Sequence, residues 1–314
     1  MYIKGGFVRI LIIGGAGFIG SALCNYYKNG NNITIIDNFS IGRLNKLLVG
    51  SKLIVADASS FYFGNLERFD LVFFMPALCN SKDFVKYPFS SYSSGVASLL
   101  NFLNTYSYVG DIKLVVFSSS EVYGETECND SKNNFSVIFN DRLGYDFGKL
   151  SLEVISELYS REYGLDYIVV RPFNVYGEYE YRDGVITKFI KQALSKLPLT
   201  IYGDGSQKRC FMHIDDFIRA IDILINNWKP GTYNIGNPDE PISVLELANK
   251  INTMCGNDKI NILPCPFDDI EERVPIINKL VKLGFKPQVN LDNGLERVIN
   301  WAKNEDFEIV RLTD

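Results

Sequence analysis

The chain has 314 residues, 46% of them hydrophobic and 22% charged, and its formal net charge is −5. This length allows one large domain or two smaller ones, and the composition excludes a disordered chain. The acidic balance excludes a strongly basic surface of the kind that binds nucleic acid or an acidic membrane. Six scattered cysteines without a C-x-x-C pair argue against a disulfide framework, and a single histidine argues against a zinc site. We therefore expect a cytoplasmic protein with reduced cysteines and no metal.

The first half of the chain alternates predicted strands and helices. Short apolar runs rich in β-branched residues predict buried strands at 7–13, 33–36, 52–55, 71–75, 114–117 and 167–170. Helical patterns lie at 18–28, near 93–106 and at 141–163. Gly30 lies where the end of the first helix favours positive φ. This alternation predicts an α/β protein with a Rossmann-type doubly wound parallel sheet.

The pattern changes after about residue 171. Clusters of turn residues lie at 202–206, 228–231 and 236–238. Ser243 and Glu246 form a capping-box pattern, which predicts the start of a helix that ends near residue 254. These short elements predict a smaller C-terminal α/β lobe rather than a continuation of the first sheet.

The first motif with a chemical interpretation is a glycine pattern between a predicted strand and a predicted helix. Gly14, Gly17 and Gly20 permit a tight turn and a close approach of the backbone to a pyrophosphate, and the helix start offers N–H groups to the phosphates. Asp37 ends the second strand about 20 residues later, where a carboxylate accepts ribose hydroxyls and repels a 2′-phosphate. A plain tight turn is the alternative. The spacing favours a nucleotide site, for NAD rather than NADP.

The second motif is the pair Tyr145 and Lys149 within the predicted helix 141–163. Residues four apart lie on one face of a helix, and a nearby ammonium lowers the pKa of a phenol, which is about 10 when unperturbed. Such a tyrosine suits a general base near neutral pH, and a solvated pair is the ordinary alternative. An apolar stripe explains the packing of this helix, and Tyr145 and Lys149 lie outside it. The stripe consists of Leu143, Phe147, Leu150, Val154 and Leu158.

The third motif is the serine-rich segment 118–124, which follows the predicted strand 114–117. Small hydroxyl side chains at the carboxyl end of a parallel strand lie in the crevice where open α/β sheets bind ligands. Taken alone, an ordinary serine-rich loop is the better interpretation.

These three motifs, in this order, resemble the extended short-chain dehydrogenase/reductase family, and within it the nucleotide-sugar epimerases and dehydratases. The resemblance runs over almost the whole chain and is supported by the segments 35–42, 171–177, 199–209 and 213–216. It implies an NAD-dependent enzyme that oxidises and reduces C4 of a nucleotide-diphosphate sugar. It also implies a Rossmann NAD-binding domain over residues 1–172 and a nucleotide-sugar substrate lobe over residues 173–314, of which about 210–236 return to the first domain.

The resemblance implies roles for individual residues. Tyr145 would take the proton of the sugar hydroxyl, Lys149 would bind the nicotinamide ribose, and Ser119 would hydrogen-bond the reacting oxygen. Glu121 matches the base that acts at C5 in dehydratases. The residues expected at the cofactor are Gly14, Gly17, Phe18, Ile19, Gly20, Asp37, Asn38, Ser40, Gly42, Asp57, Ala58, Pro76, Tyr145, Lys149, Pro172 and Phe173. The residues expected at the substrate are Ser119, Asn174, Tyr202, Arg209 and Arg273. A guanidinium suits phosphate oxygens, so the two arginines are expected at the diphosphate.

The expected net reaction is epimerisation at C4, and three alternatives stay open. Net dehydrogenation would release the 4-keto sugar, and 4,6-dehydration would use Glu121. A non-catalytic NAD-binding sensor on the same fold is the alternative from another class. Ser120 stands where glucose dehydratases carry an aspartate, and Gly184 stands where decarboxylases usually carry an arginine. Both positions favour the epimerases.

Departures from the family pattern fall on the nicotinamide side, at residues 74–78 and 95–98. His213 lies in an apolar run and is expected to be a buried structural histidine rather than a catalytic base.

The resemblance also implies a homodimer or higher homo-oligomer, formed by the helices at 92–106 and 141–163. The first of these helices has an apolar face of Val96, Leu99, Leu100 and Leu103. Burial of this face within one chain is the alternative. The expected partners are therefore a nucleotide-diphosphate sugar and a second copy of the chain, with no nucleic acid and no membrane.

Overall fold

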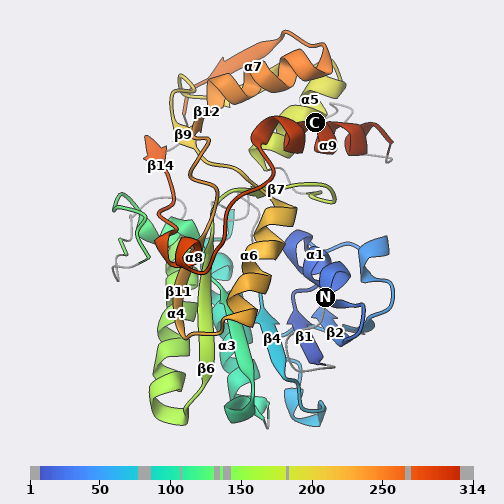
Figure 1. Ribbon diagram of the computed structural model, residues 1–314, viewed down its shortest axis with the longest axis vertical. Coiled ribbons are helices and arrows are strands. Elements are labelled where there is room, and N and C mark those ends of the chain that lie inside the picture. Colours follow the sequence, from blue (N-terminus) through green and yellow to red (C-terminus); the bar gives the residue numbers. More distant parts are fainter. Residues whose placement is uncertain are drawn as a thin grey trace. The chain divides into compact units, whose positions relative to one another are not determined.

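Figure 1 shows the computed structural model, which describes residues 8–76, 86–106, 108–130, 135–136, 143–181, 184–265 and 270–304. The chain forms two compact units. Unit 1 comprises Met1–Pro172, Ile218–Ile235 and Asn278–Phe285, and unit 2 comprises Phe173–Phe217, Gly236–Ile277 and Lys286–Asp314. The chain thus leaves unit 1 after Pro172 and returns to it twice. The second return, at Asn278–Phe285, has no counterpart among the predicted segments.

Within the described residues, unit 1 is built on a seven-stranded parallel sheet in the order β11-β6-β5-β4-β1-β2-β3. The strands are β1 (Arg9–Ile13), β2 (Asn32–Asp37), β3 (Lys52–Val55), β4 (Leu71–Phe74), β5 (Lys113–Phe117), β6 (Asp166–Pro172) and β11 (Gly231–Ile235). The first six are the predicted strands, because runs of large apolar residues suit strands that are covered on both faces. This sheet confirms the predicted Rossmann-type, doubly wound α/β class.

Helices cover both faces of this sheet (Figure 1). The helices of unit 1 are α1 (Phe18–Tyr27), α3 (Pro88–Thr105), α4 (Leu143–Tyr163), α6 (Ile214–Asn226), whose first turn belongs to unit 2, and α8 (Asn278–Lys282), with the 3-10 helices η1 (Lys46–Leu48), η2 (Phe63–Asn65), η3 (Val109–Asp111) and η4 (Ser120–Tyr123). On one face, Leu99 of α3 and Leu152 of α4 join the core formed with the strands. On the other face, Tyr27 of α1 stacks on Phe73 of β4 and donates a hydrogen bond to Asp222 of α6.

The strands described in unit 2 pair into three small sheets, in the orders β10-β7, β12-β9-β14 and β13-β8. The elements of this unit are β7 (Val175–Tyr176), α5 (Val185–Leu194), β8 (Leu199–Tyr202), β9 (Lys208–Arg209), β10 (Met212–His213), β12 (Ile242–Ser243), α7 (Val244–Cys255), β13 (Ile260–Leu263), β14 (Glu272–Arg273) and α9 (Leu291–Asn304). Helices α5, α7 and α9 share one apolar core. The predicted capping box is confirmed, because Ser243 Oγ accepts from the Glu246 amide (3.1 Å) and the Glu246 carboxylate accepts from the Ser243 amide (2.9 Å).

Some element boundaries differ from the prediction. The helix predicted near 93–106 begins earlier, at Pro88, because proline fits the first helical position, where its missing N–H is not needed. The first helix ends at Tyr27 rather than at residue 28, and Gly30 has the predicted positive φ, at 86°. The predictions that fall on Phe7, Ala77, Leu78, Asp141 and Arg142 lie outside the described residues.

The prediction that an apolar stripe packs helix α4 holds for Leu150, which is buried, but is wrong for most of the stripe. Three of its members are 45%, 50% and 55% exposed, namely Phe147, Val154 and Leu158. Helix α4 approaches α3 through glycines instead. Gly144 lies directly against the backbone of Pro88, and a Cβ on Gly148 would lie 3.0 Å from the carbonyl oxygen of Tyr92. Glycine lets two backbones approach closely, and this contact turns the stripe away from the core.

The apolar face predicted on α3 is mostly internal. Leu99 and Leu103 are buried in the core of unit 1, and Val96 packs against that core. Only Leu100 counts among the exposed members, at 37%. The alternative of burial within one chain therefore holds for most of this face.

None of the helices in the described part of the chain has the length and apolar character that crossing a membrane requires. Among the same residues, no group of three or more His, Cys, Asp or Glu could hold a metal ion. Among the described cysteines, Cys24, Cys128, Cys210, Cys255 and Cys265 form no disulfide bond with one another.

Candidate active site

The loop between β1 and α1 is a tight turn that ends in a helix N-terminus without a side-chain cap. Gly14 has φ +84°, and a Cβ on Gly20 would lie 2.7 Å from the Gly14 carbonyl oxygen, so both positions require glycine. Gly17 is the N-cap of α1, and no side chain there bonds the helix. The first helical amides, those of Phe18 and Ile19, therefore form the kind of N-terminus that binds an anion. These residues fit the pyrophosphate of a dinucleotide.

Asp37, at the end of β2, ties the glycine loop to its neighbouring segment. Its Oδ2 accepts a hydrogen bond from the amide of Ala16 (2.9 Å), and its Oδ1 accepts from the amide of Phe39 (2.8 Å). Gly42 also lies on the loop, since a Cβ there would lie 2.7 Å from the Cβ of Ala16. A carboxylate has about four lone-pair sites, so the half-buried Asp37 keeps acceptor capacity for ribose hydroxyls. The sequence predicted that capacity but not the role in fixing the loop.

Asn38 and Asp57 follow β2 and β3 and are in contact. Asn38 Nδ2 donates to Asp57 Oδ2 (2.9 Å), and Asn38 Oδ1 accepts from the amide of Ser40 (3.0 Å). Hydrogen bonds from the side chain and the amide of Ser59 lower the pKa of Asp57. Ala58, beside it, is buried. These residues, predicted for the cofactor, thus gather at neighbouring carboxyl ends of the sheet.

Pro76 follows β4 and borders the glycine loop. A Cβ on Gly14 would lie 3.3 Å from the Pro76 nitrogen, and a Cβ on Gly95 of α3 would lie 3.0 Å from the Pro76 carbonyl oxygen. Pro76 and Gly95 belong to the two segments that depart from the family pattern, and the structure brings them into contact. A side chain at position 95 would press on this carbonyl, so the two departures suit each other.

The predicted Tyr–Lys pair lies at the end of β5. Lys149 is 4% exposed, its Nζ donates to the carbonyl of Phe117 (2.8 Å), and the same Nζ lies 5.8 Å from the ring centroid of Tyr145. Ser119 is the N-cap of η4, where its Oγ accepts from the amide of Glu121 (3.2 Å). Tyr145 and Glu121 are half-buried. The role of Glu121 at C5 stays a prediction.

A buried ion pair behind this loop had no sequence prediction. Glu153 of α4 accepts two hydrogen bonds from Arg171 of β6, at 2.7 and 2.9 Å, and the side chains are 11% and 5% exposed. The hydroxyl of Ser118 donates a short hydrogen bond to the same carboxylate. Glu153 follows Lys149 by four residues, so the helical spacing that singles out Tyr145 and Lys149 was the signal that could have found it.

In unit 2, two arginines predicted for the substrate are neighbours. Arg209 of β9 and Arg273 of β14 are Cα partners in a parallel ladder. Directly paired residues present their side chains on one face of a sheet, so the two arginine side chains leave the ladder on the same face. Arg209 Nη1 donates to the carbonyl of Ile270 (2.8 Å), and Arg273 is 3% exposed. Two arginines at paired positions of neighbouring strands suit a diphosphate.

The remaining residues predicted for the site differ in their solvent exposure. Asn174 is exposed, has φ +35°, and donates to a backbone carbonyl. Tyr202 is 39% exposed, and Lys188 Nζ lies 5.0 Å from its ring centroid. Pro172, which ends β6 in unit 1, is half-buried. Phe173, predicted at the cofactor, is fully buried, so its side chain is not available to a cofactor in this structure and only its backbone could take part.

His213 is buried and fully hydrogen-bonded, which confirms the expectation of a structural histidine. Its Nδ1 accepts from the amide of Asp215 (3.2 Å), so its Nε2 carries the proton and donates to Glu178 (3.1 Å). Burial opposes ionisation of Glu178, but this hydrogen bond and the nearby charge of Arg297 outweigh it and lower the pKa of Glu178 to about 2.

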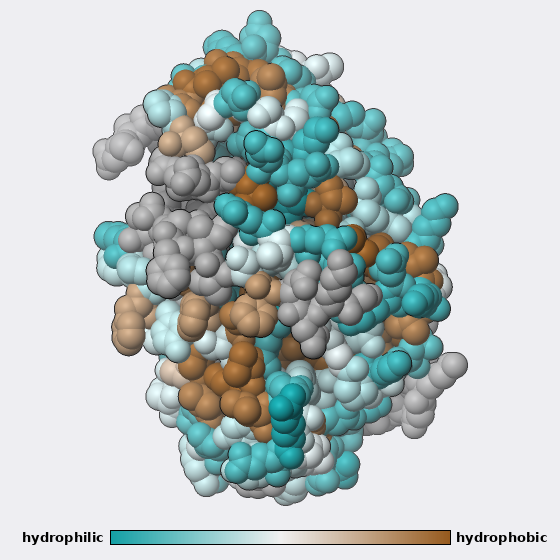
Figure 2. Space-filling model, turned by 90° about the vertical axis from the view of Figure 1, so that its left-hand side faces the viewer, coloured by the Kyte–Doolittle hydropathy of each residue, from teal (hydrophilic) through white to brown (hydrophobic). Residues whose placement is uncertain are grey.

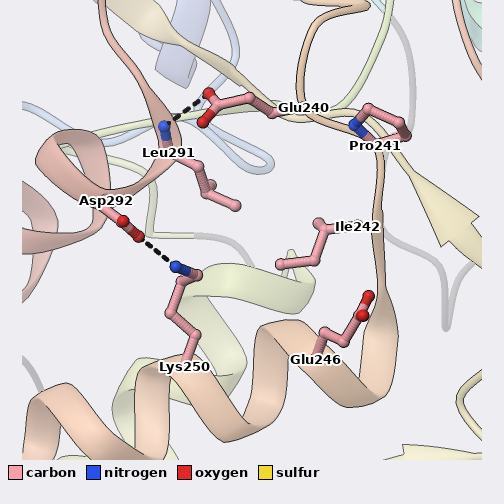
Figure 3. Close-up of a pocket in the computed structure, with 7 residues that line it drawn as sticks. All are labelled: Glu240, Pro241, Ile242, Glu246, Lys250, Leu291 and Asp292. Atoms are coloured by element: carbon pink, nitrogen blue, oxygen red, sulfur yellow. Dashed lines mark hydrogen bonds and ion pairs between the residues drawn. The ribbon is translucent and has the colours of Figure 1, made fainter.

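A pocket of about 350 Å³ in unit 2 lies between β12 and the first turns of α7 and α9 (Figure 3). Its charged side chains are committed to the fold. Glu240 accepts from the amide of Leu291 at the start of α9, Glu246 caps α7, and Lys250 pairs with Asp292. We assign no ligand to this pocket.

Comparison with known proteins places the chain in a family. The family "NAD dependent epimerase/dehydratase" matches residues 10–236. UDP-glucuronic acid decarboxylase 1 of Danio rerio is 32% identical over 310 residues, which cover 95% of this chain and 73% of that protein. A putative UDP-glucose 4-epimerase of Methanocaldococcus jannaschii is 32% identical over 307 residues, which cover 95% of this chain and 99% of that protein.

A solved structure agrees with these relatives. UDP-glucuronic acid 4-epimerase from Bacillus cereus, in complex with UDP-glucuronic acid and NAD, has a TM-score of 0.84 and 27% identity, covering 94% of this chain and 99% of that chain. These similarities confirm the family resemblance that the motifs indicated. The chain belongs to the NAD-dependent epimerase/dehydratase family.

Proposed function

We propose that the protein is an NAD-dependent nucleotide-sugar 4-epimerase, which oxidises C4 of a nucleotide-diphosphate sugar and reduces the 4-keto sugar from the other side. The observation that carries this proposal is the placement of Lys149. Its buried ammonium is bonded to the end of β5 and lies close to the ring of Tyr145. A buried ammonium favours the ionised form of a neighbouring phenol, which is the form that accepts the proton of a sugar hydroxyl.

We assign the cofactor to the carboxyl ends of the strands in unit 1. The amides at the start of α1 would bind the pyrophosphate, Asp37 the adenosine ribose, and Asp57 with Ala58 the adenine. Bound NAD supplies the chemistry of accepting and returning a hydride. The other residues assigned to this site are Gly14, Gly17, Phe18, Ile19, Gly20, Asn38, Ser40, Gly42, Pro76, Lys149, Pro172 and the backbone of Phe173.

In the proposed mechanism, Tyr145 takes the proton of the C4 hydroxyl and returns it when the keto group is reduced. Lys149 favours the ionised phenol through its charge. Ser119 donates a hydrogen bond to the same substrate oxygen as negative charge develops on it. Its Oγ is already oriented by the hydrogen bond that it accepts from the amide of Glu121.

We assign the diphosphate of the substrate to unit 2, with Arg209, Arg273 and Asn174 as its ligands and Tyr202 against the base. The register of β9 and β14, which pairs the two arginines, supports this assignment. Each of the three compared proteins has a UDP-sugar in its name, and we therefore propose a UDP-sugar as substrate.

Decarboxylation of UDP-glucuronic acid is the second candidate, because the Danio rerio relative carries that name. Oxidation at C4 would precede both reactions. Gly184, the N-cap of α5, has no side chain where decarboxylases usually carry an arginine. A Cβ at this position would lie 2.9 Å from the carboxylate of the buried Glu180. The missing arginine supports the epimerase over the decarboxylase.

Product analysis tests the proposal and separates its alternatives. The protein is incubated with NAD and either UDP-glucose or UDP-glucuronic acid, and the sugar is followed by NMR together with NADH absorbance. We expect UDP-glucose to equilibrate with its C4 epimer without net NADH. Release of CO₂ would identify a decarboxylase, a 4-keto sugar with NADH a dehydrogenase, and a 4-keto-6-deoxy sugar a dehydratase that uses Glu121. NAD binding without any turnover would identify a sensor and overturn the proposal.

We also propose that the protein forms a homodimer through an exposed apolar surface on α3 and α4. This α3/α4 apolar surface consists of Phe89, Leu100, Phe147, Val154 and Leu158, which are 37–76% exposed. Figure 2 views the molecule from the left-hand side of Figure 1 and shows hydrophobic residues gathered in the lower part of this view. Contiguous apolar surface marks interaction sites, and a helix pair can bury it against a second copy about a two-fold axis. A cytoplasmic location stays a prediction.

A further inference from the structure

Glu153 lies on the face of α4 that carries Tyr145 and Lys149. The three residues follow each other at intervals of four, so each lies little more than one helical turn after the last. Lys149 Nζ donates to the carbonyl of the last residue of β5, and Glu153 accepts from the hydroxyl of Ser118, the next residue. Two successive residues at the end of β5 are therefore tied to α4. The residue that follows them is Ser119.

The carboxylate of Glu153 is fixed by Arg171. The two groups share hydrogen bonds of 2.7 and 2.9 Å, and their side chains are 11% and 5% exposed. Burial opposes the charge of Arg171, but the hydrogen bonds and the charge of Glu153 outweigh it and raise the pKa of Arg171 above its ordinary value. The guanidinium is therefore charged, and the pair is held in a two-point geometry.

Arg171 also contacts the other end of the segment that begins at Ser118 and ends at Tyr123. Its guanidinium lies 4.6 Å from the ring centroid of Tyr123, the last residue of η4. Tyr123 is fully buried and donates a hydrogen bond to Asn234 of β11 (2.8 Å). The guanidinium is thus in contact with the end of η4, while the carboxylate that it pairs with holds the beginning of the segment.

The Glu153–Arg171 pair therefore anchors both ends of the segment 118–123. We propose that Glu153 is a positioning residue, which fixes the hydroxyl of Ser119 relative to Tyr145 by holding this segment in place. The proposal rests on the proposed function, in which these two side chains meet the same substrate oxygen. A pair that only stabilised the fold would leave the geometry of the reaction unchanged once the protein is folded, so the two roles can be separated by experiment.

Glu153→Gln is the direct test, because it keeps the size of the side chain and removes the charge. We expect kcat to fall roughly 10- to 100-fold with KM changed little, since a displacement of about 1 Å has an effect of this size. We also expect the acidic limb of the kcat–pH profile to move to higher pH. The reason is that a misplaced Ser119 no longer stabilises the negative charge shared by the phenol and the substrate oxygen.

Glu157→Gln is the matched control on the same helix. The carboxylate of Glu157 also accepts from an arginine, Arg161 (2.6 Å), and from a hydroxyl, that of Tyr167 (2.7 Å). Neither partner belongs to the segment 118–123. We expect kcat and the pH profile of this variant to stay within about twofold of the wild type.

Hydrogen exchange gives a measurement that needs no turnover. We expect the amides of the segment 118–123 to exchange faster in Glu153→Gln than in the wild type and in Glu157→Gln. Ser118→Ala removes one anchor without leaving a buried charge unpaired. It should act in the same direction with a smaller effect, and it decides the question if Glu153→Gln does not fold.

The outcomes separate the positioning role from the proposed function. An active enzyme whose kcat and pH profile are unchanged by Glu153→Gln would overturn the positioning role, whatever the exchange rates. A wild-type protein without turnover on any nucleotide sugar would overturn the proposed function. In that case, unchanged exchange over 118–123 would overturn the anchoring role of Glu153 as well, and faster exchange would support it.

Discussion

The two faces of helix α4 depart from the usual arrangement of a surface helix, although Leu152 of this helix lies in the core of unit 1. The inward face carries Lys149 and Glu153, whose charged groups are bonded to the end of β5 and almost hidden from solvent. The outward face carries Phe147, Val154 and Leu158, which are 45%, 50% and 55% exposed. A surface helix normally buries its apolar stripe and exposes its charges.

The buried charges and the exposed apolar side chains indicate that α4 is not arranged for the stability of one chain alone. A buried charge lowers stability unless it is paired, and an exposed apolar face gains nothing until it is covered. Both features are explained if the inward face serves the reaction and the outward face serves an interface between copies. Local rules of this kind are broken mainly at functional sites. The contrast can be tested one face at a time.

The largest effect is expected on the inward face, from Lys149→Met, which removes the ammonium and keeps much of the side-chain length. We expect kcat to fall roughly 10²- to 10⁴-fold, because Tyr145 loses the charge that favours its ionised form. Steady-state assays with the substrate identified by NMR measure this fall. Arg161→Met, at a site 75% exposed on the same helix, is the control. If kcat of Lys149→Met stayed within about threefold of the wild type, the ammonium of Lys149 would have no role in the reaction.

The second effect compares a buried and an exposed ion pair on the same helix. Arg171→Met leaves the carboxylate of Glu153 buried without its partner, and we expect the free energy of unfolding to fall by about 3–5 kcal/mol. Arg161→Met breaks the exposed pair with Glu157, and we expect a fall of about 0.5 kcal/mol or less. Urea unfolding measures both. Equal effects would show that the inward pair is no more critical than an ordinary surface pair.

The third effect concerns the outward face. We expect the double variant Val154→Glu/Leu158→Glu to convert the proposed homodimer into monomers, because the interface would have to bury unpaired carboxylates. Light scattering at micromolar concentration measures the mass. Val281→Glu, at a site 54% exposed on α8 and outside the α3/α4 apolar surface, is the control. A double variant that stays dimeric would show that the interface lies elsewhere. A monomeric wild type would contradict the proposed homodimer.

The smallest effect concerns Glu178 of unit 2, another carboxylate that accepts hydrogen bonds, here from His213 and Arg297. Its pKa of about 2 lies below the ordinary value of 4.5, so its ionised form stabilises the fold above about pH 4.5 and this contribution is lost as the pH falls towards 2. We expect Glu178→Gln to lower the free energy of unfolding by about 1–3 kcal/mol at neutral pH. The difference from the wild type should shrink below pH 4.5. Urea unfolding across this range measures it, and a difference independent of pH would contradict the lowered pKa.

Much of unit 1 could be predicted because its signals are local. The strands are short apolar runs, and the glycine turn is encoded by Gly14, Gly17 and Gly20. The closeness of Tyr145 and Lys149 follows from helical spacing alone. The capping box of Ser243 and Glu246 was likewise complete within four residues. Each of these features needs no knowledge of what packs against it.

The other features of the fold and of the candidate site could not be predicted, because they depend on contacts between segments that are distant in the sequence. The sequence does not say which face of α4 meets α3, and Gly144 and Gly148 decided this against the apolar stripe. The Glu153–Arg171 pair joins residues 18 positions apart, and the hydroxyl of Ser118 joins them from 35 positions away. The burial of Phe173 was also set by tertiary packing. A local pattern does not determine such partners.

The central claim is that Tyr145 is the base that takes the proton of the sugar hydroxyl. Tyr145→Phe tests it most directly, since the variant loses only the phenol oxygen. We predict that kcat falls by at least roughly 10²-fold, while the dissociation constant of NAD, measured by calorimetry on the same preparation, stays within about threefold of the wild type. A variant that turns over its UDP-sugar at the wild-type rate would contradict the account.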